Sequence, residues 1–67
     1  MYQEIYTLAV DYYSKAVSAD SAYVYAFGRR AYCYLQIGET DKACIDFKTA
    51  AELGGDYGKR MLEEYCK

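Results

Sequence analysis

Small and large apolar side chains alternate at helical spacing near the start of this chain. Ala9, Tyr13 and Ala16 stand at positions i, i+4 and i+7, and on an α-helix such residues form one stripe on a single face. The helical pattern continues along the chain in pieces separated by short joints. It predicts an all-α fold of three main helices and a short C-terminal one, over residues 2–18, 22–37, 41–53 and 56–66.

The joints contain residues that commonly begin or end helices. Gly38 is placed to end the second helix as a C-cap, and Thr40 to cap the start of the third. Gly54 can break the third helix through its conformational freedom. Asp20 and Ser21 form a weaker stop, which we interpret as an N-cap for the second helix.

The apolar stripe of the first helix occurs a second time, 34 residues later. The second copy consists of Ala43, Phe47 and Ala50. Between the two copies, an aromatic residue, a small residue and a tyrosine follow one another along the second helix, at Phe27, Ala31 and Tyr34. A period of 34 residues is typical of one class of helix-turn-helix repeat.

This combination resembles the tetratricopeptide repeat (TPR) family, in which an aromatic, a small residue and Tyr on one helix precede A-x-x-x-F and Ala on the next. The resemblance covers nearly the whole chain, as one full repeat and two part repeats. It implies a single domain, a fragment of an α-solenoid made of antiparallel helix-turn-helix hairpins. Its parts are the second helix of a preceding repeat, a full repeat and a capping helix, over residues 1–20, 22–55 and 56–67.

A second relative is a close alternative. Residues 50–54, which read AAELG, together with Leu62 are also similar to the Sel1-like repeat, a related helical hairpin with a longer period. The 34-residue spacing favours the TPR family.

Arg30 stands where the TPR family usually has leucine. A variant of the repeat carries arginine there together with an Asp-Phe pair on the next helix, and Asp46 and Phe47 provide that pair. The resemblance therefore implies a structural ion pair between Arg30 and Asp46 across the hairpin, because buried charges persist mainly when they are paired. The alternative is a role in ligand binding.

The second helix carries another stripe beside its packing face. Its members are spaced at i, i+3, i+4, i+7 and i+11 and are Tyr25, Gly28, Arg29, Tyr32 and Gln36. Of these, Tyr25, Arg29, Tyr32 and Gln36 are the candidate partner-binding residues. In the family this stripe lines a concave groove where peptides or helices dock, and tyrosine with arginine is a composition typical of binding surfaces. The alternative is that the tyrosines only fill space between helices, since the chain contains 10 of them.

Composition argues against several other functions. The chain has no histidine, no Gly-rich phosphate loop and no metal-binding cysteine pair, so we expect no enzyme activity, no metal and no cofactor. A net charge of −2 and a pI of about 4.9 make nucleic acid an unsuitable partner. No apolar run approaches the roughly 20 residues needed to span a bilayer, so we expect a soluble chain without membrane insertion.

The chain is short for a repeat array, which usually needs about three units to bury a continuous core. Either it is a piece of a longer solenoid, or another copy pairs with the first helix and covers its stripe of Ala9, Tyr13 and Ala16. We expect a non-catalytic scaffold module that binds a protein or peptide partner. The alternative is a structural C-terminal cap or homodimerisation element of a longer solenoid, with no groove ligand.

The three cysteines match no zinc or thioredoxin-like spacing. Cys33 is expected to be buried. Antiparallel packing of the third and fourth helices would bring Cys44 and Cys66 together, and a resemblance to C-terminal segments of bacterial family members favours their joint use in a disulfide. The alternative, which we favour, is a pair of reduced thiols in a cytoplasmic protein, whereas a disulfide would indicate a periplasmic or secreted one.

Overall fold

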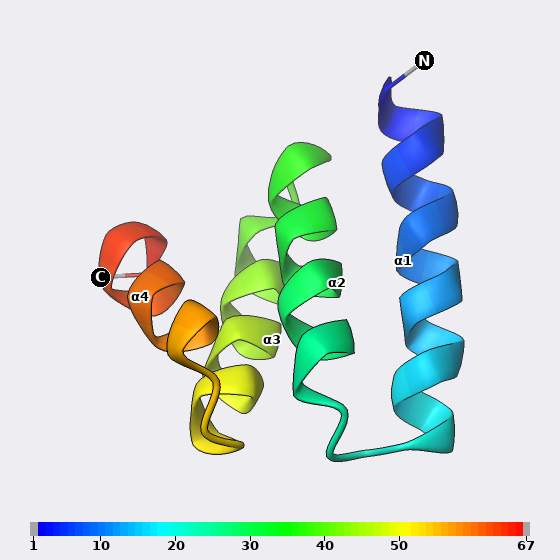
Figure 1. The fold of residues 1–67 in the computed structure, drawn as a ribbon. Helices are drawn as coiled ribbons and strands as arrows, with labels where there is room; N and C mark the ends of the chain where they lie inside the picture. Colours follow the sequence, from blue (N-terminus) through cyan, green and yellow to red (C-terminus); the bar gives the residue numbers. More distant parts are fainter. Residues whose placement is uncertain (1, 67) are drawn as a thin grey trace.

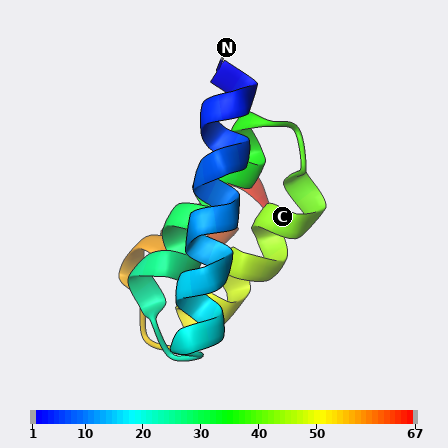
Figure 2. The same ribbon diagram turned by 90° about the vertical axis from the view of Figure 1, so that its right-hand side faces the viewer.

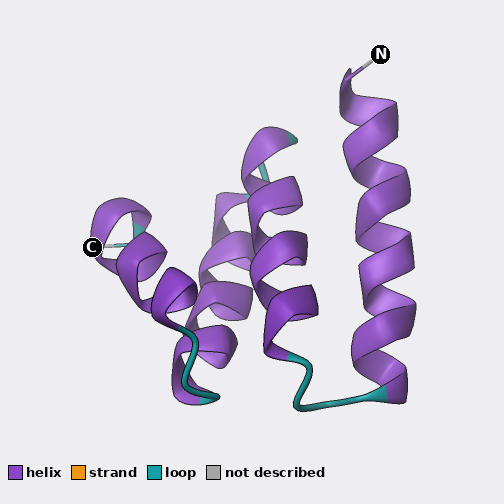
Figure 3. Ribbon diagram, viewed as in Figure 1, coloured by secondary structure: helices purple, strands orange, loops and turns teal. Residues whose placement is uncertain are grey.

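The computed structural model describes residues 2–66, and this part of the chain forms α-helices joined by short loops, without strands (Figure 3). The helices are α1 (Tyr2–Ala19), α2 (Val24–Gln36), α3 (Thr40–Glu52) and α4 (Asp56–Tyr65). The all-α prediction is therefore confirmed. Each helix end lies within two residues of the boundary expected from the sequence.

Consecutive helices run antiparallel and follow one another across the molecule, from α1 at one edge to α4 at the other (Figure 1). α1 packs on α2, α2 on α3, and α3 on α4. The molecule measures 31 × 28 × 14 Å along its principal axes. Seen from the α1 edge, α1 crosses in front of the other helices (Figure 2).

The α1 stripe that was expected to receive a helix from another copy packs within its own chain. Ala9, Tyr13 and Ala16 are half-buried. The Tyr13 ring meets the Tyr25 ring of α2 edge to face, with 6.5 Å between the ring centroids. Tyr13 of this stripe therefore packs on α2 of its own chain, and pairing of the stripe with another copy stays a prediction.

Glycines in the left-handed conformation end α2 and α3. Gly38 has a φ of 83° and Gly54 a φ of 93°, values that residues with a Cβ rarely adopt. After α2, the Gly38 N–H donates to the Leu35 carbonyl and the Glu39 N–H to the Tyr34 carbonyl, which is the hydrogen-bond pair of a Schellman motif. Gly38 thus ends α2, as the sequence predicted.

The N-caps expected for α2 and α3 are wrong. Thr40 is the first residue of α3 rather than its cap, and Glu39 in the cap position makes no side-chain capping hydrogen bond. Before α2, Asp20 Oδ1 accepts a hydrogen bond from the Ala22 N–H at 3.1 Å, whereas the helix begins only at Val24. The aspartate therefore stabilises the turn between α1 and α2 instead of the helix start.

The hydrophobic core lies between α2, α3 and α4 and combines small residues with one large ring. Ala31, Ala43 and Phe47 are fully buried. Half-buried side chains pack around this cluster, namely Tyr34, Leu35, Met61, Leu62 and Cys66. Met61 and Leu62 belong to α4, and Cys66 is the residue after it. Burial of their apolar surface, at about 25 cal/mol per Å², stabilises the packing of α4 on the α2–α3 hairpin.

Arg30 connects three helices through its guanidinium group. Its Nε and Nη2 atoms donate to the two carboxylate oxygens of Asp46 at 2.7 and 2.8 Å, and its Nη1 donates to Ser14 Oγ at 3.1 Å. Asp46 is only 3% exposed, so this bidentate pair is largely shielded from water. The hydrogen bond with Asp46 raises the pKa of Arg30. The pair joins α2 to α3, and the serine contact adds α1.

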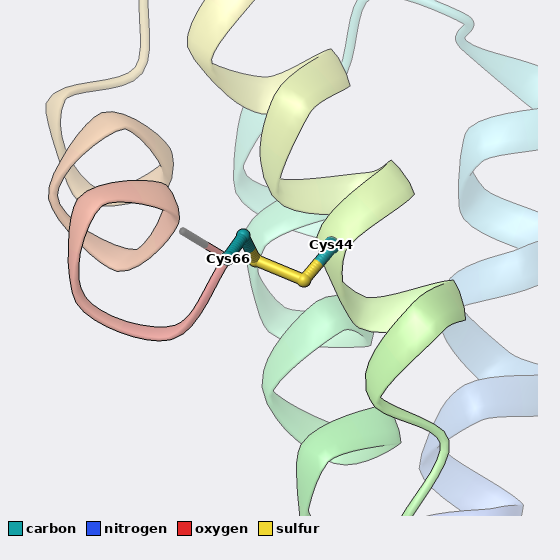
Figure 4. Close-up of a disulfide and its surroundings, with 2 residues drawn as sticks. All are labelled: Cys44 and Cys66. Atoms are coloured by element: carbon teal, nitrogen blue, oxygen red, sulfur yellow. A yellow bond between two sulfur atoms is a disulfide. The ribbon is translucent and has the colours of Figure 1, made fainter.

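A disulfide joins Cys44, in the second turn of α3, to Cys66, the residue after α4 (Figure 4). The two Cα atoms are 5.8 Å apart, an ordinary separation for a bridge. The favoured alternative of two reduced thiols is therefore wrong. The bond fixes the C-terminal end of α4 to α3.

We expect Gly58→Ala to lower the free energy of unfolding by about 1–2 kcal/mol, measured by urea unfolding. A Cβ at Gly58 would lie 2.8 Å from both Ala50 Cβ and the Phe47 carbonyl oxygen, so α3 and α4 would have to separate. Gly28→Ala is the matched control, because its Cβ would meet only the Tyr57 ring at 3.2 Å, which can turn aside. Equal losses in the two variants would contradict the close packing of α3 and α4.

Candidate functional site

The exposed side of α2 carries a cation between two tyrosine rings. Arg29 lies one helical turn from both Tyr25 and Tyr32, and its guanidinium carbon is 5.9 and 5.8 Å from their ring centroids. These distances correspond to two cation–π contacts. Tyr25 and Arg29 are exposed and Tyr32 is half-buried. We call these three residues the Tyr–Arg cluster.

Two tyrosines of α1 support this cluster from one side. The Tyr13 ring packs on Tyr25 and the Tyr6 ring on Tyr32, edge to face, at centroid distances of 6.5 and 6.2 Å. A hydrogen bond to Tyr13 raises the pKa of Arg29, although desolvation opposes the effect. Arg29 therefore stays positively charged throughout the physiological pH range.

A cavity of about 500 Å³ opens beside the Tyr–Arg cluster, between α2 and the start of α4. Small residues contribute much of its lining, namely Gly28, Ala50, Gly55 and Gly58. Larger side chains border it as well, namely Val24, Tyr25, Arg29, Asp56 and Tyr57. The lining is mostly apolar, and its volume falls in the range of small-ligand sites.

Tyr57 is a wall of this cavity that the sequence pattern did not reveal, because residues 56–67 were assigned only a capping role. Its ring packs edge to face on Phe47, with centroids 5.9 Å apart, and desolvation by burial raises the pKa of Tyr57. The available signal was Gly58, since a glycine within a helical pattern often marks a close packing contact.

The other residues singled out from the sequence lie apart from the cavity. Gln36 is exposed at the C-terminal end of α2 and does not line it. Arg30 and Asp46 form the ion pair between α2 and α3, and Cys44 and Cys66 form the disulfide. The structure therefore brings together Tyr25, Arg29 and Tyr32 of the predicted binding stripe, and Gly28 of the same stripe lines the cavity beside them.

Cys33, the cysteine outside the disulfide, does not line the cavity. Cys33 is a free, buried thiol, and desolvation raises its pKa while the charge of Arg29 offsets part of the shift, so the thiol is a weak nucleophile at neutral pH. Among residues 2–66, no three or more potential metal ligands lie together. Nor is any helix in the described part of the chain long and apolar enough to cross a membrane.

Comparisons with protein-family models, with curated proteins and with solved structures found no match for this chain.

Proposed function

We propose that this chain is a non-catalytic scaffold module of the TPR type that binds an extended segment of a protein or peptide. The observation that carries this proposal is the exposed Tyr–Arg cluster beside an open, mostly apolar cavity. Tyrosine and arginine are enriched among the residues that dominate the binding energy of protein interfaces. An apolar side chain of the partner can be buried in the cavity.

Three features support the TPR assignment. The apolar stripe recurs after 34 residues, neighbouring helices run antiparallel, and Arg30 pairs with Asp46 as in the variant that the sequence resembles. On this proposal, α2 and α3 form the full repeat and α1 is the second helix of a preceding one. α4 then caps the open side of α3.

The cavity and the Tyr–Arg cluster would recognise different parts of a ligand. An apolar side chain that fills the cavity gains about 1.5–3 kcal/mol from burial. The guanidinium of Arg29 can donate hydrogen bonds to a carboxylate, and the rings of Tyr25 and Tyr32 offer flat surfaces for packing. We therefore expect a ligand with an apolar anchor next to an acidic group.

A structural role is the second candidate function. In that case the chain is a cap or a homodimerisation element of a longer solenoid, and the cavity holds no ligand. The observation that favours this role is a line of exposed apolar side chains on α1, away from the cluster. Because the two roles use different surfaces, separate substitutions distinguish them.

The disulfide supports an oxidising compartment for the module, such as a periplasm or the extracellular space. Thiols in the cytoplasm are kept reduced, so structural disulfides are rare there. This location replaces the cytoplasmic one that reduced cysteines would have favoured.

The proposed function can be tested by selecting ligands from a random peptide library with the purified, disulfide-bonded chain. Extended peptides of about eight residues span the 28 Å dimension of the molecule. We expect the selected peptides to combine an apolar residue with Asp or Glu. Arg29→Ala should weaken their binding at least about tenfold in calorimetric titrations, because it removes a hydrogen bond to a charged group.

Lys42→Ala is the matched control for Arg29→Ala. Lys42 is another exposed cation beside a tyrosine, with its Nζ 5.8 Å from the ring centroid of Tyr34, but it does not line the cavity. Its replacement should leave peptide affinity unchanged. If the selection yields no peptide, or if both variants bind equally well, the proposed function is wrong.

A further inference from the structure

Helix α1 has two apolar faces, of which α2 covers one. The covered face consists of half-buried residues, namely Tyr6, Val10, Tyr13 and Val17. On the other face, Ile5, Leu8 and Tyr12 are 62%, 69% and 70% exposed. Their spacing of i, i+3 and i+7 places them in one line along the helix. We call these three residues the outer stripe.

The outer stripe is not the usual surface of an amphipathic helix. At about 100° per residue, it lies about 140° around α1 from the face that contacts α2, where a surface helix normally presents polar side chains. Exposed polar residues instead gather along one flank of the stripe, among them Glu4, Thr7, Asp11 and Lys15. A line of large apolar side chains beside a polar flank is typical of an interaction surface.

We propose that the outer stripe binds the outer stripe of a second copy of this chain, with the two α1 helices antiparallel around a two-fold axis. Such an interface is self-complementary, because each copy contributes the same surface. With the axis near Leu8, Ile5 of one copy lies level with Tyr12 of the other. The two Leu8 side chains then occupy the centre of the contact.

The charges on the polar flank favour the antiparallel arrangement. A two-fold axis perpendicular to both helices brings the polar flank of one α1 next to the same flank of the other. Glu4 of one copy then lies within about 3 Å, along the helix axis, of both Lys15 and Asp11 of the second copy, at 1.5 Å per residue. Lys15 is about 40° nearer to the outer stripe than Asp11, so the attraction exceeds the repulsion, and the contact occurs twice. A parallel pair, related by a two-fold axis along the helices, would place the two polar flanks on opposite sides of the contact, so Glu4 and Lys15 could not pair.

The dimer is expected to be weak and reversible. One face of α1, which has 18 residues, offers less area than a standard stable interface.

Dimerisation through the outer stripe does not depend on peptide binding by the Tyr–Arg cluster, since the outer stripe lies on the opposite side of α1 from α2. The alternative occupant of the outer stripe is a helix of a longer chain. If the stripe fits only such a helix, the isolated chain stays monomeric.

The test is sedimentation equilibrium of the disulfide-bonded chain over a range from about 10 μM to 1 mM. We expect a monomer–dimer equilibrium, and Leu8→Glu should raise the dissociation constant at least about tenfold, because it places a charge in the centre of the apolar contact. Ile45→Glu is the matched control. Ile45 is 64% exposed on α3, outside the stripe, so its replacement should leave dimerisation unchanged.

Charge reversal tests the antiparallel register. Glu4→Lys alone and Lys15→Glu alone should each weaken the dimer about two- to fivefold, and the double reversal should restore the wild-type constant. Far-UV circular dichroism checks that every variant keeps its helices. A chain that stays monomeric at about 1 mM, an unaltered constant in Leu8→Glu, or a double reversal no better than the single ones would overturn the proposal.

Discussion

Replacing Arg30 by methionine should lower the free energy of unfolding by about 3–5 kcal/mol, measured by urea unfolding followed by circular dichroism. The substitution leaves Asp46, which is only 3% exposed, without the two hydrogen bonds that neutralise its charge. Methionine retains most of the aliphatic part of the side chain, so the loss reports chiefly on the pairing. Asp46→Leu should cost less, because the Arg30 side chain is 18% exposed and water can hydrate part of its charge.

The double variant Arg30→Met/Asp46→Leu should recover part of the loss, because two apolar side chains leave no buried charge unpaired. Lys42→Met is the control, since it breaks the exposed pair with Glu39 and should change stability by less than about 1 kcal/mol. A double variant whose destabilisation equals the sum of the two single ones would show that Arg30 and Asp46 do not stabilise each other.

The helices themselves were predictable because they depend on local patterns. Apolar spacing located all four of them, and Gly38 and Gly54 marked two of the ends, since their positive φ angles of 83° and 93° suit glycine alone. Helix starts were less predictable. The Asp20 side chain bonds to the Ala22 N–H within a turn, and a short polar residue can serve a turn or a helix equally well.

The candidate site was only partly predictable, for a related reason. The contacts of Arg29 with Tyr25 and Tyr32 follow from spacings of four and three residues on one helix. The cavity, in contrast, depends on how closely α4 approaches α3, and that distance is set by the lack of a side chain at Gly58. Tyr57 becomes a wall of the cavity only because of this tertiary contact.

The cysteine pair could not be settled from the sequence. Antiparallel packing of α3 and α4 brings Cys44 near Cys66, but a bond also requires a suitable Cα–Cα distance, which is 5.8 Å in the structure. That distance depends on the tilt of α4 against α3, which is a tertiary property. The local pattern is therefore compatible with both bonded and reduced cysteines.

Reducing the disulfide should lower the free energy of unfolding by about 3 kcal/mol, because a bridge between residues 22 apart removes that much chain entropy from the unfolded state in the loop-closure model. The change should be visible as a lower urea midpoint when a dithiol reductant is added. Cys44→Ser/Cys66→Ser should show the same loss without reductant. Cys33→Ala retains the disulfide, so it should remain as sensitive to reductant as the wild-type chain.

The effect of reduction should extend to the Tyr–Arg cluster through α4. The hydrogen bonds and ion pairs observed between side chains in residues 2–66 do not include one from α4 to another helix, so apolar packing and the disulfide hold α4 in place. Amide hydrogen exchange in α4 should therefore accelerate more than in α2 after reduction. Peptide affinity should fall as well, since Tyr57 is carried on α4. Unchanged exchange in α4 together with an unchanged urea midpoint would show that packing alone positions this helix.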